Sequence, residues 1–180
     1  MNSSVIIVAA GNGTRFKGEI PKQYVRINNE TILNMTVRKF INLDQIRYIQ
    51  PVINIKHENI YNETIKNLKS LKNFKKILPP CFGGNERCVS VKKGLIAISK
   101  LEDNPNKVLI HDAARPNLSP KSLKNLWEEG SKSNVGAILA TQVSETLKKQ
   151  VPNENTKINK RNASNRRHHH RDVLLKHSRQ

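Results

Sequence analysis

The chain has 180 residues, enough to bury a core in a single domain, and carries a formal net charge of +18 with a pI near 10.2. No apolar stretch approaches the roughly 20 residues of a membrane span, and no targeting segment precedes the first strand, so we expect a cytoplasmic protein without a membrane partner. The charge is spread along the chain, which is typical of a solvated surface and disfavours a specific nucleic-acid partner. We expect Cys81 and Cys88 to be unpaired thiols in a reducing compartment.

The first 24 residues combine a buried strand with a glycine-rich, basic loop. The apolar residues 5–10 are followed by Gly11-Asn12-Gly13-Thr14-Arg15 and then by Pro21-Lys22-Gln23-Tyr24. Two glycines let the backbone approach a polyphosphate and direct N–H groups toward it, while Arg15 and Lys22 supply neutralising charge. The loop has neither the third glycine of a dinucleotide fingerprint nor the Gly-Lys-Ser/Thr of a P-loop. The pattern therefore predicts a site for a nucleoside triphosphate.

Apolar periodicity predicts alternating strands and helices as far as about residue 150. The predicted strands are residues 5–10, 46–55, 76–78, 107–111 and 136–140. The predicted helices are residues 31–41, 59–71, 86–100 and 119–131. This alternation implies an α/β fold with a mainly parallel sheet and helices on both faces, whose ligands bind beyond the carboxyl ends of the strands. Residues 1–150 are predicted to form this domain.

Residues 151–180 differ in character from the rest of the chain. From Pro152 onward there are eight Lys or Arg against two acidic residues, with no aromatic residue and no glycine. We predict a basic tail that is disordered or at best forms a marginal final helix. On such a tail, the run His168-His169-His170 favours adventitious metal binding over a metal centre.

A second polar motif is Gly83-Gly84-Asn85-Glu86-Arg87. Paired glycines after a strand let the main chain lie against a flat base, and Ser90 can reach the same place one turn into the following helix. The alternative is a plain turn in which Arg87 is a cation on the helix surface.

A third polar motif, His111-Asp112-Ala113-Ala114-Arg115-Pro116, follows a buried strand. A carboxylate at this position can hold Mg²⁺ or a substrate hydroxyl, while Arg115 meets a phosphate; the alternative is an Asp112–Arg115 ion pair that tightens a turn. Further on, Thr146 and Lys148 either touch a second phosphate or belong to a solvated strand end.

Together these motifs resemble the 2-C-methyl-D-erythritol 4-phosphate cytidylyltransferase family over residues 5–148. The resemblance rests on Ala9-Ala10-Gly11-x-Gly13-x-Arg15, Pro21-Lys22-Gln23-Tyr24, Gly83-Gly84-x-x-Arg87-x-x-Ser90-Val91 and His111-Asp112-Ala113-Ala114-Arg115-Pro116. It implies a Rossmann-like nucleotidyltransferase fold, a homodimer held by a β-arm, and attack of the phosphate of methylerythritol phosphate on the α-phosphate of CTP. Pyrophosphate would leave, and Mg²⁺ is the expected cofactor because it is the usual partner of a triphosphate.

The resemblance also implies a role for each matching residue. The residues implied to stabilise charge on the α-phosphate are Arg15 and Lys22. Those implied to bind CTP are Ala10, Gly11, Gly13, Gly84, Asn85 and Ser90. Those implied to contact the polyol phosphate are Asp112, Arg115 and Thr146. No side chain is assigned as a metal ligand.

The tail departs from the family pattern, which continues with an arm arginine, a Thr-Pro-Gln segment and a late lysine. We interpret the chain as a C-terminally truncated or frame-altered member, expected to bind CTP weakly and to turn over poorly or not at all. Two alternatives stay open: a cytidylyltransferase for ribitol 5-phosphate or another polyol phosphate, and a noncatalytic basic protein whose tail binds nucleic acid.

Overall fold

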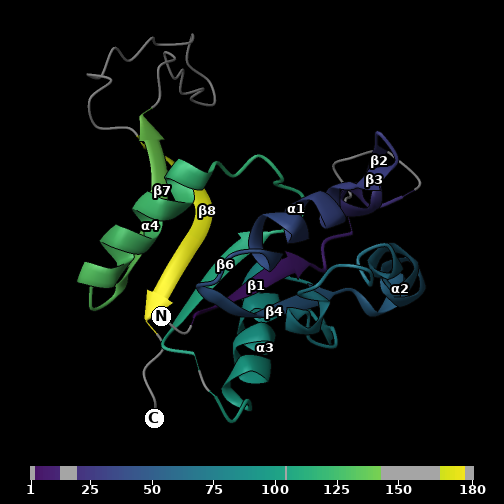
Figure 1. Cartoon of the computed structure of the whole chain (residues 1–180), viewed down its shortest axis with the longest axis horizontal. Helices are drawn as coiled ribbons and strands as arrows, with labels where there is room; N and C mark the ends of the chain where they lie inside the picture. The colour runs from purple at the N-terminus through teal and green to yellow at the C-terminus, as the bar shows by residue number, and fades with distance from the viewer. Residues whose placement is uncertain (1–2, 13–19, 104, 143–166, 177–180) are drawn as a thin grey trace, which may run out of the picture.

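The computed structural model describes residues 3–12, 20–103, 105–142 and 167–176, which Figure 1 shows as coloured ribbon. The strands are β1 Ser3–Ala9, β2 Arg26–Ile27, β3 Glu30–Thr31, β4 Ile46–Ile53, β5 Cys81–Phe82, β6 Lys107–Asp112, β7 Gly136–Gln142 and β8 Arg167–Lys176. The α-helices are α1 Ile32–Ile41, α2 Glu58–Lys66, α3 Arg87–Ser99 and α4 Pro120–Lys132; single 3-10 turns are η1 Lys22–Tyr24, η2 Ile55–His57 and η3 Phe74–Lys76. None of the described helices is long and apolar enough to cross a membrane.

A six-stranded sheet in the order β5-β4-β1-β6-β8-β7 forms the centre of the molecule (Figure 1). The pairs β1–β4, β1–β6 and β4–β5 are parallel, and β8 is antiparallel to both of its neighbours. Because side chains alternate across a strand, Val5 and Ile7 pack with α1, α2 and α4, whereas Ile6 packs with Ile98 of α3. The predicted mainly parallel sheet with helices on both faces is confirmed.

Side-chain caps explain why two helices begin within one residue of the predicted positions. The Thr31 hydroxyl accepts a hydrogen bond from the Asn34 N–H at 3.2 Å, and the Ser119 hydroxyl accepts one from the Ser122 N–H at 3.0 Å. Both caps satisfy backbone donors that have no partner inside the helix. In α4 the cap is followed by Pro120, which needs no hydrogen-bond partner at that position.

Two sequence predictions between residues 59 and 82 are wrong in extent. The helix α2 ends at Lys66, and the chain continues to Leu71 in turns that still bury Leu68, so the apolar spacing persists where the helix does not. The strand predicted at residues 76–78 is reduced to one parallel bridge between Ile77 and Ile49. The strand that pairs with β4 in this region is β5, which begins later, at Cys81. The next residues are Pro79 and Pro80, which lack the N–H donors of a ladder.

The prediction that the whole tail is disordered or helical is wrong for Arg167–Lys176, which form β8. This strand lies between β6 and β7, with Leu174 in register with Leu109 on one side and Ala137 on the other. Composition favoured disorder because few apolar residues are present, but backbone ladders on both sides supply hydrogen-bond partners that composition does not reveal. The sheet therefore extends past the predicted domain boundary at residue 150, while residues 151–166 lie outside the described part.

Gly83 brings the loop after β5 against the end of β1. Its N–H donates to the Ile53 carbonyl at 2.8 Å, and a Cβ at this position would collide with the Ala10 Cβ and lie 2.6 Å from the Ser90 Oγ. Gly11, on the loop after β1, has no atom within 4 Å of an added Cβ. Close packing thus requires glycine at residue 83, whereas residue 11 faces open space.

Gly83→Ala should lower the free energy of unfolding by about 1–3 kcal/mol, because the added methyl group overpacks the contact with Ala10 and Ser90. Gly11→Ala is the matched control and should stay within about 0.5 kcal/mol of the wild type. Urea denaturation followed by far-UV circular dichroism measures both values. Equal stability of the two variants would contradict the close approach of the loops.

Candidate functional site

A cavity of about 410 Å³ lies at the carboxyl ends of β1, β4 and β6. Eight residues singled out from the sequence line it: Ala10, Gly11, Lys22, Gly84, Asn85, Ser90, Asp112 and Arg115. The other three, Gly13, Arg15 and Thr146, lie outside the described residues. Motifs that are far apart in the sequence meet here because parallel strands deliver their following loops to the same edge of the sheet.

The loop after β1 is held by polar side chains from other elements. The Gln23 side-chain amide donates to the carbonyl oxygens of Ala9 and Gly11. From the end of β4, the Asn54 amide nitrogen donates to the Asn12 side-chain oxygen at 2.6 Å. The exposed Lys22 stands immediately before Gln23 and supplies a positive charge to the cavity.

The loop after β5 is shaped by Ser90, which is 1% exposed. Its hydroxyl accepts a hydrogen bond from the Gly84 N–H at 3.1 Å and lies 3.1 Å from the Glu86 carbonyl oxygen, to which it can donate. The ammonium group of Lys93 donates to the Gly83 carbonyl at 3.0 Å. These contacts make Ser90 a support for the loop, and a direct contact between Ser90 and a base stays a prediction.

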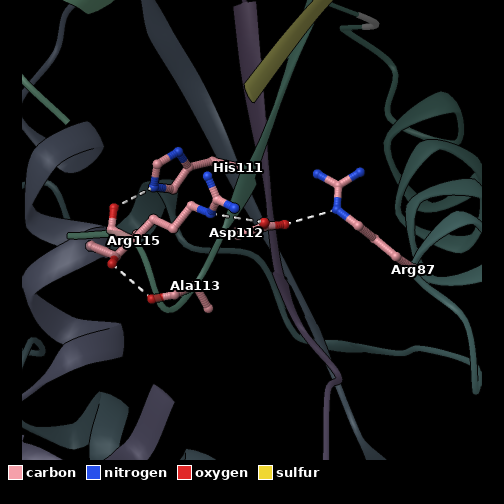
Figure 2. A network of polar contacts seen from close by, with 6 residues as sticks. Arg87, His111, Asp112, Ala113 and Arg115 are labelled. Carbon is pink, nitrogen blue, oxygen red and sulfur yellow. Dashed lines mark hydrogen bonds and ion pairs between the residues drawn. The ribbon is translucent and has the colours of Figure 1, made fainter. Parts of the chain in front are cut away.

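Asp112, at the end of β6, lies between two guanidinium groups (Figure 2). Its Oδ1 is 2.9 Å from the Arg87 Nε, and its Oδ2 is 3.2 Å from the Arg115 Nε. The ion pair proposed as an alternative for Asp112 and Arg115 is therefore formed. The alternative in which Arg87 is only a cation on the helix surface is wrong, because Arg87 at the start of α3 forms an ion pair with Asp112 at the end of β6. The three side chains together carry a net charge of +1, which favours an anionic ligand.

The loop after β6 is anchored to the core. His111 is 1% exposed, and its Nε2 hydrogen-bonds the Arg115 carbonyl at 2.9 Å (Figure 2). Its ring also meets the Phe40 ring edge-on. The Thr36 hydroxyl donates to the Ala113 carbonyl at 2.8 Å. Sequence reasoning missed Thr36; the signal was a threonine among the buried positions of α1. These bonds hold Asp112 and Arg115 in place.

A second cavity of about 390 Å³ adjoins the first and shares Ala114 and Arg115 with it. The remaining lining residues are His111, Pro116, Asn117, Leu118, Ser119, Ser122, Leu139 and Ala140. Sequence reasoning missed this cavity, because its walls come from the start of α4 and from β7, which lie together only in the folded chain. Arg115 is thus within reach of ligands in both cavities.

Metal-binding groups are sparse in the described part of the chain, where no cluster of three or more His, Cys, Asp or Glu side chains is suited to hold an ion. Both carboxylate oxygens of Asp112 already contact guanidinium groups. The described side chains therefore do not form a metal site by themselves.

Two thiols flank the loop after β5. Cys81 and Cys88 are both free, as predicted, and Cys88 is exposed. Burial raises the pKa of the Cys81 thiol, so its thiolate is less populated than that of an ordinary cysteine.

Comparisons with known sequences identify the family of the chain. Residues 3–166 match the family 2-C-methyl-D-erythritol 4-phosphate cytidylyltransferase. The bifunctional enzyme IspD/IspF of Wolbachia pipientis is 38% identical over 145 residues, which are 80% of this chain and 35% of that protein. The 2-C-methyl-D-erythritol 4-phosphate cytidylyltransferase of Petrotoga mobilis is 36% identical over 143 residues, covering 79% and 60% respectively. The chain thus spans less than two thirds of the length of these relatives.

Solved structures share the fold. The 2-C-methyl-D-erythritol 4-phosphate cytidylyltransferase of Francisella tularensis has a TM-score of 0.70 and 32% identity, and the match covers 98% of this chain and 73% of that one. The 4-diphosphocytidyl-2C-methyl-D-erythritol synthase of Anaerococcus prevotii has a TM-score of 0.75 at 21% identity, with 97% and 70% covered, which bears on the fold alone. The family match over residues 3–166 shows that this chain belongs to the 2-C-methyl-D-erythritol 4-phosphate cytidylyltransferase family.

Proposed function

We propose that this chain binds CTP in the first cavity and belongs to a protein that transfers the cytidylyl group to 2-C-methyl-D-erythritol 4-phosphate. The observation that carries the proposal is the pair of adjoining cavities that share Arg115. One cavity suits a nucleotide and the other a phosphorylated acceptor, so the two phosphates meet at one guanidinium group. The products are a CDP-alcohol and pyrophosphate.

The first cavity offers the groups that a nucleoside triphosphate needs. The glycine at residue 11 leaves room for close approach of the phosphates, and Lys22, which lines the same cavity, supplies positive charge. On the other wall, Gly84 and Asn85 line the cavity and are proposed to contact the base through backbone groups other than the Gly84 N–H, which donates to Ser90. We assign the proposed charge stabilisation at the α-phosphate to Lys22 and Arg15, and a proposed contact with CTP to Gly13.

The transfer itself requires no nucleophilic side chain. An oxygen of the acceptor phosphate forms a bond to the α-phosphorus of CTP, the bond from that phosphorus to the β-phosphate oxygen breaks, and pyrophosphate takes the electron pair. Positioning and neutralisation of charge then provide the catalysis. Arg115 and Asp112 would hold the acceptor, since each Asp112 oxygen keeps a second lone pair for a substrate hydroxyl. Thr146 is proposed to contact the same ligand.

Mg²⁺ is the proposed cofactor and would enter with the triphosphate, because Asp112 is engaged by two arginines and no cluster of three or more ligating side chains is found among the described residues. We also propose a cytoplasmic location and the homodimer that the family resemblance implies. A nucleic-acid partner is not expected, since the tail has no aromatic residue to stack on bases.

CTP with Mg²⁺ should raise the midpoint of thermal unfolding, because a ligand that binds only the folded state stabilises it by about 2.7 kcal/mol at about 100 times its Kd. ATP should give a much smaller rise. Differential scanning fluorimetry measures the shift. In a separate assay, the purified chain should show little cytidylyl transfer to methylerythritol phosphate or to ribitol 5-phosphate. No shift with CTP would reject the nucleotide site, and robust turnover would reject the predicted impairment.

Lys22→Ala should weaken CTP binding about 10-fold to 100-fold, because a charge-assisted contact with phosphate contributes about 1.5–3 kcal/mol. Lys39→Ala removes an exposed lysine of α1 that does not line the cavity and serves as the control. Isothermal titration calorimetry gives both affinities. Equal affinities for the two variants would show that Lys22 does not contact the nucleotide.

Asp112→Asn should lower the free energy of unfolding by about 1–2 kcal/mol, because two guanidinium groups are left facing each other without the carboxylate between them. Asp103→Asn breaks the exposed ion pair with Arg47 and should cost less than about 1 kcal/mol. Urea denaturation distinguishes the two. A smaller loss for the Asp112 variant than for the Asp103 variant would contradict the bridging role.

A further inference from the structure

Gln23 is a buried polar residue that the proposed reaction does not use directly. It is 5% exposed and lines the first cavity. Its side-chain nitrogen donates to the Ala9 carbonyl at 2.7 Å and to the Gly11 carbonyl at 3.0 Å. A primary amide has two N–H donors, so this group is fully used in joining two residues of the loop after β1.

The position of Gln23 is itself well defined. Tyr24 beside it is 3% exposed and belongs to the core, and the Tyr24 N–H donates to the Pro21 carbonyl at 2.8 Å. Pro21 restricts φ before this turn, and the Val25 N–H closes it on the Lys22 carbonyl at 3.2 Å. The amide of Gln23 is thus presented from a fixed turn, next to the lysine proposed to meet the triphosphate.

The two bonds have an electrostatic consequence for an anion in the cavity. A carbonyl oxygen carries partial negative charge and repels phosphate when it faces one. Here the carbonyls of Ala9 and Gly11 are directed to the Gln23 amide. A trans peptide places its N–H opposite its C=O, so the bond to Gly11 also sets the direction of the Asn12 N–H. The amide therefore orders the loop backbone in a form compatible with phosphate.

We propose that Gln23 is a positioning residue for the triphosphate loop: its amide holds the Ala9 and Gly11 carbonyls away from the phosphates and keeps the loop preorganised. The inference rests on the proposed CTP site. It goes beyond that proposal by assigning the ordered conformation of the loop after β1 to the side chain of Gln23, which acts without touching the nucleotide.

The chain contains a matched control for this chemistry. Gln50 of β4 is 3% exposed, and its side-chain nitrogen also donates to two carbonyls, those of Pro51 at 3.0 Å and Pro79 at 2.9 Å. Gln50 does not line the cavity. Replacing either glutamine by methionine keeps the approximate volume and removes both donors, so the two variants lose similar bonds in different places.

The test compares Gln23→Met, Gln23→Glu and Gln50→Met in the 180-residue chain. Hydrogen–deuterium exchange without nucleotide should be faster at residues 9–12 in both Gln23 variants and unchanged there in Gln50→Met. Calorimetry should show CTP affinity about 10-fold lower for Gln23→Met and within 2-fold of wild type for Gln50→Met. Gln23→Glu should bind more weakly still, because a carboxylate repels both the carbonyls and the triphosphate.

The outcomes separate this inference from the proposed function. If the wild-type chain binds no CTP, the proposed function fails, and exchange at residues 9–12 still decides whether Gln23 orders the loop. Unchanged exchange in the folded Gln23 variants overturns the inference. It is also overturned if Gln50→Met weakens CTP binding as much as Gln23→Met, since the effect would then follow general stability.

Discussion

The carboxylate of Asp112 joins the two loops on which the site depends. It ends β6 and takes one guanidinium from the start of α3 and another from its own loop, so the walls of the first cavity are connected through one side chain. The three groups are partly buried, where opposite charges attract more strongly than in bulk water. Because the single carboxylate of Asp112 pairs with two guanidinium groups, the three side chains keep a net positive charge, which suits a phosphorylated ligand.

Around this ion-pair network the site is built mostly from backbone, and side chains from outside the loops support it. Gln23 and Ser90 bond to backbone groups of the loops after β1 and β5, and Thr36 bonds to the loop after β6. The close approach at Gly83 brings the first two loops together. Loops supported in this way suit phosphoryl transfer, in which positioning and charge stabilisation take the place of a nucleophilic side chain.

Two adjoining cavities lie at this edge of the sheet. Lys22 and the loops after β1 and β5 surround one cavity, the start of α4 and the end of β7 border the other, and Arg115 lies at their junction. This geometry supports the proposed placement of nucleotide in the first cavity and acceptor in the second. Family membership fits it, although the chain spans only part of the length of its relatives.

The sequence by itself determined the local features of this protein. The apolar run before Gly11, the helix starts near Thr31 and Ser119, and the motifs after β5 and β6 all depend on residues close together in the chain, so periodicity and motif spacing located them. Eight of the predicted site residues are consequently found around one cavity. Family resemblance supplied their chemical roles, which local patterns alone left open.

Only the tertiary structure decided the features that depend on distant segments. Composition predicted a tail without strands, but β8 gains hydrogen-bond partners from β6 and β7, which lie more than 20 residues earlier in the chain. The sequence left open whether Arg87 belongs to a binding motif or is a surface cation, and the fold places it beside Asp112. The apolar spacing continues through Leu68, so it did not mark the end of α2 at Lys66. The hydrogen bonds from the Gln23 amide to the carbonyls of Ala9 and Gly11 likewise could not be predicted from the sequence pattern. These contacts join residues that the fold brings together, and the spacing of residues along the chain does not show which distant residues will be neighbours in space.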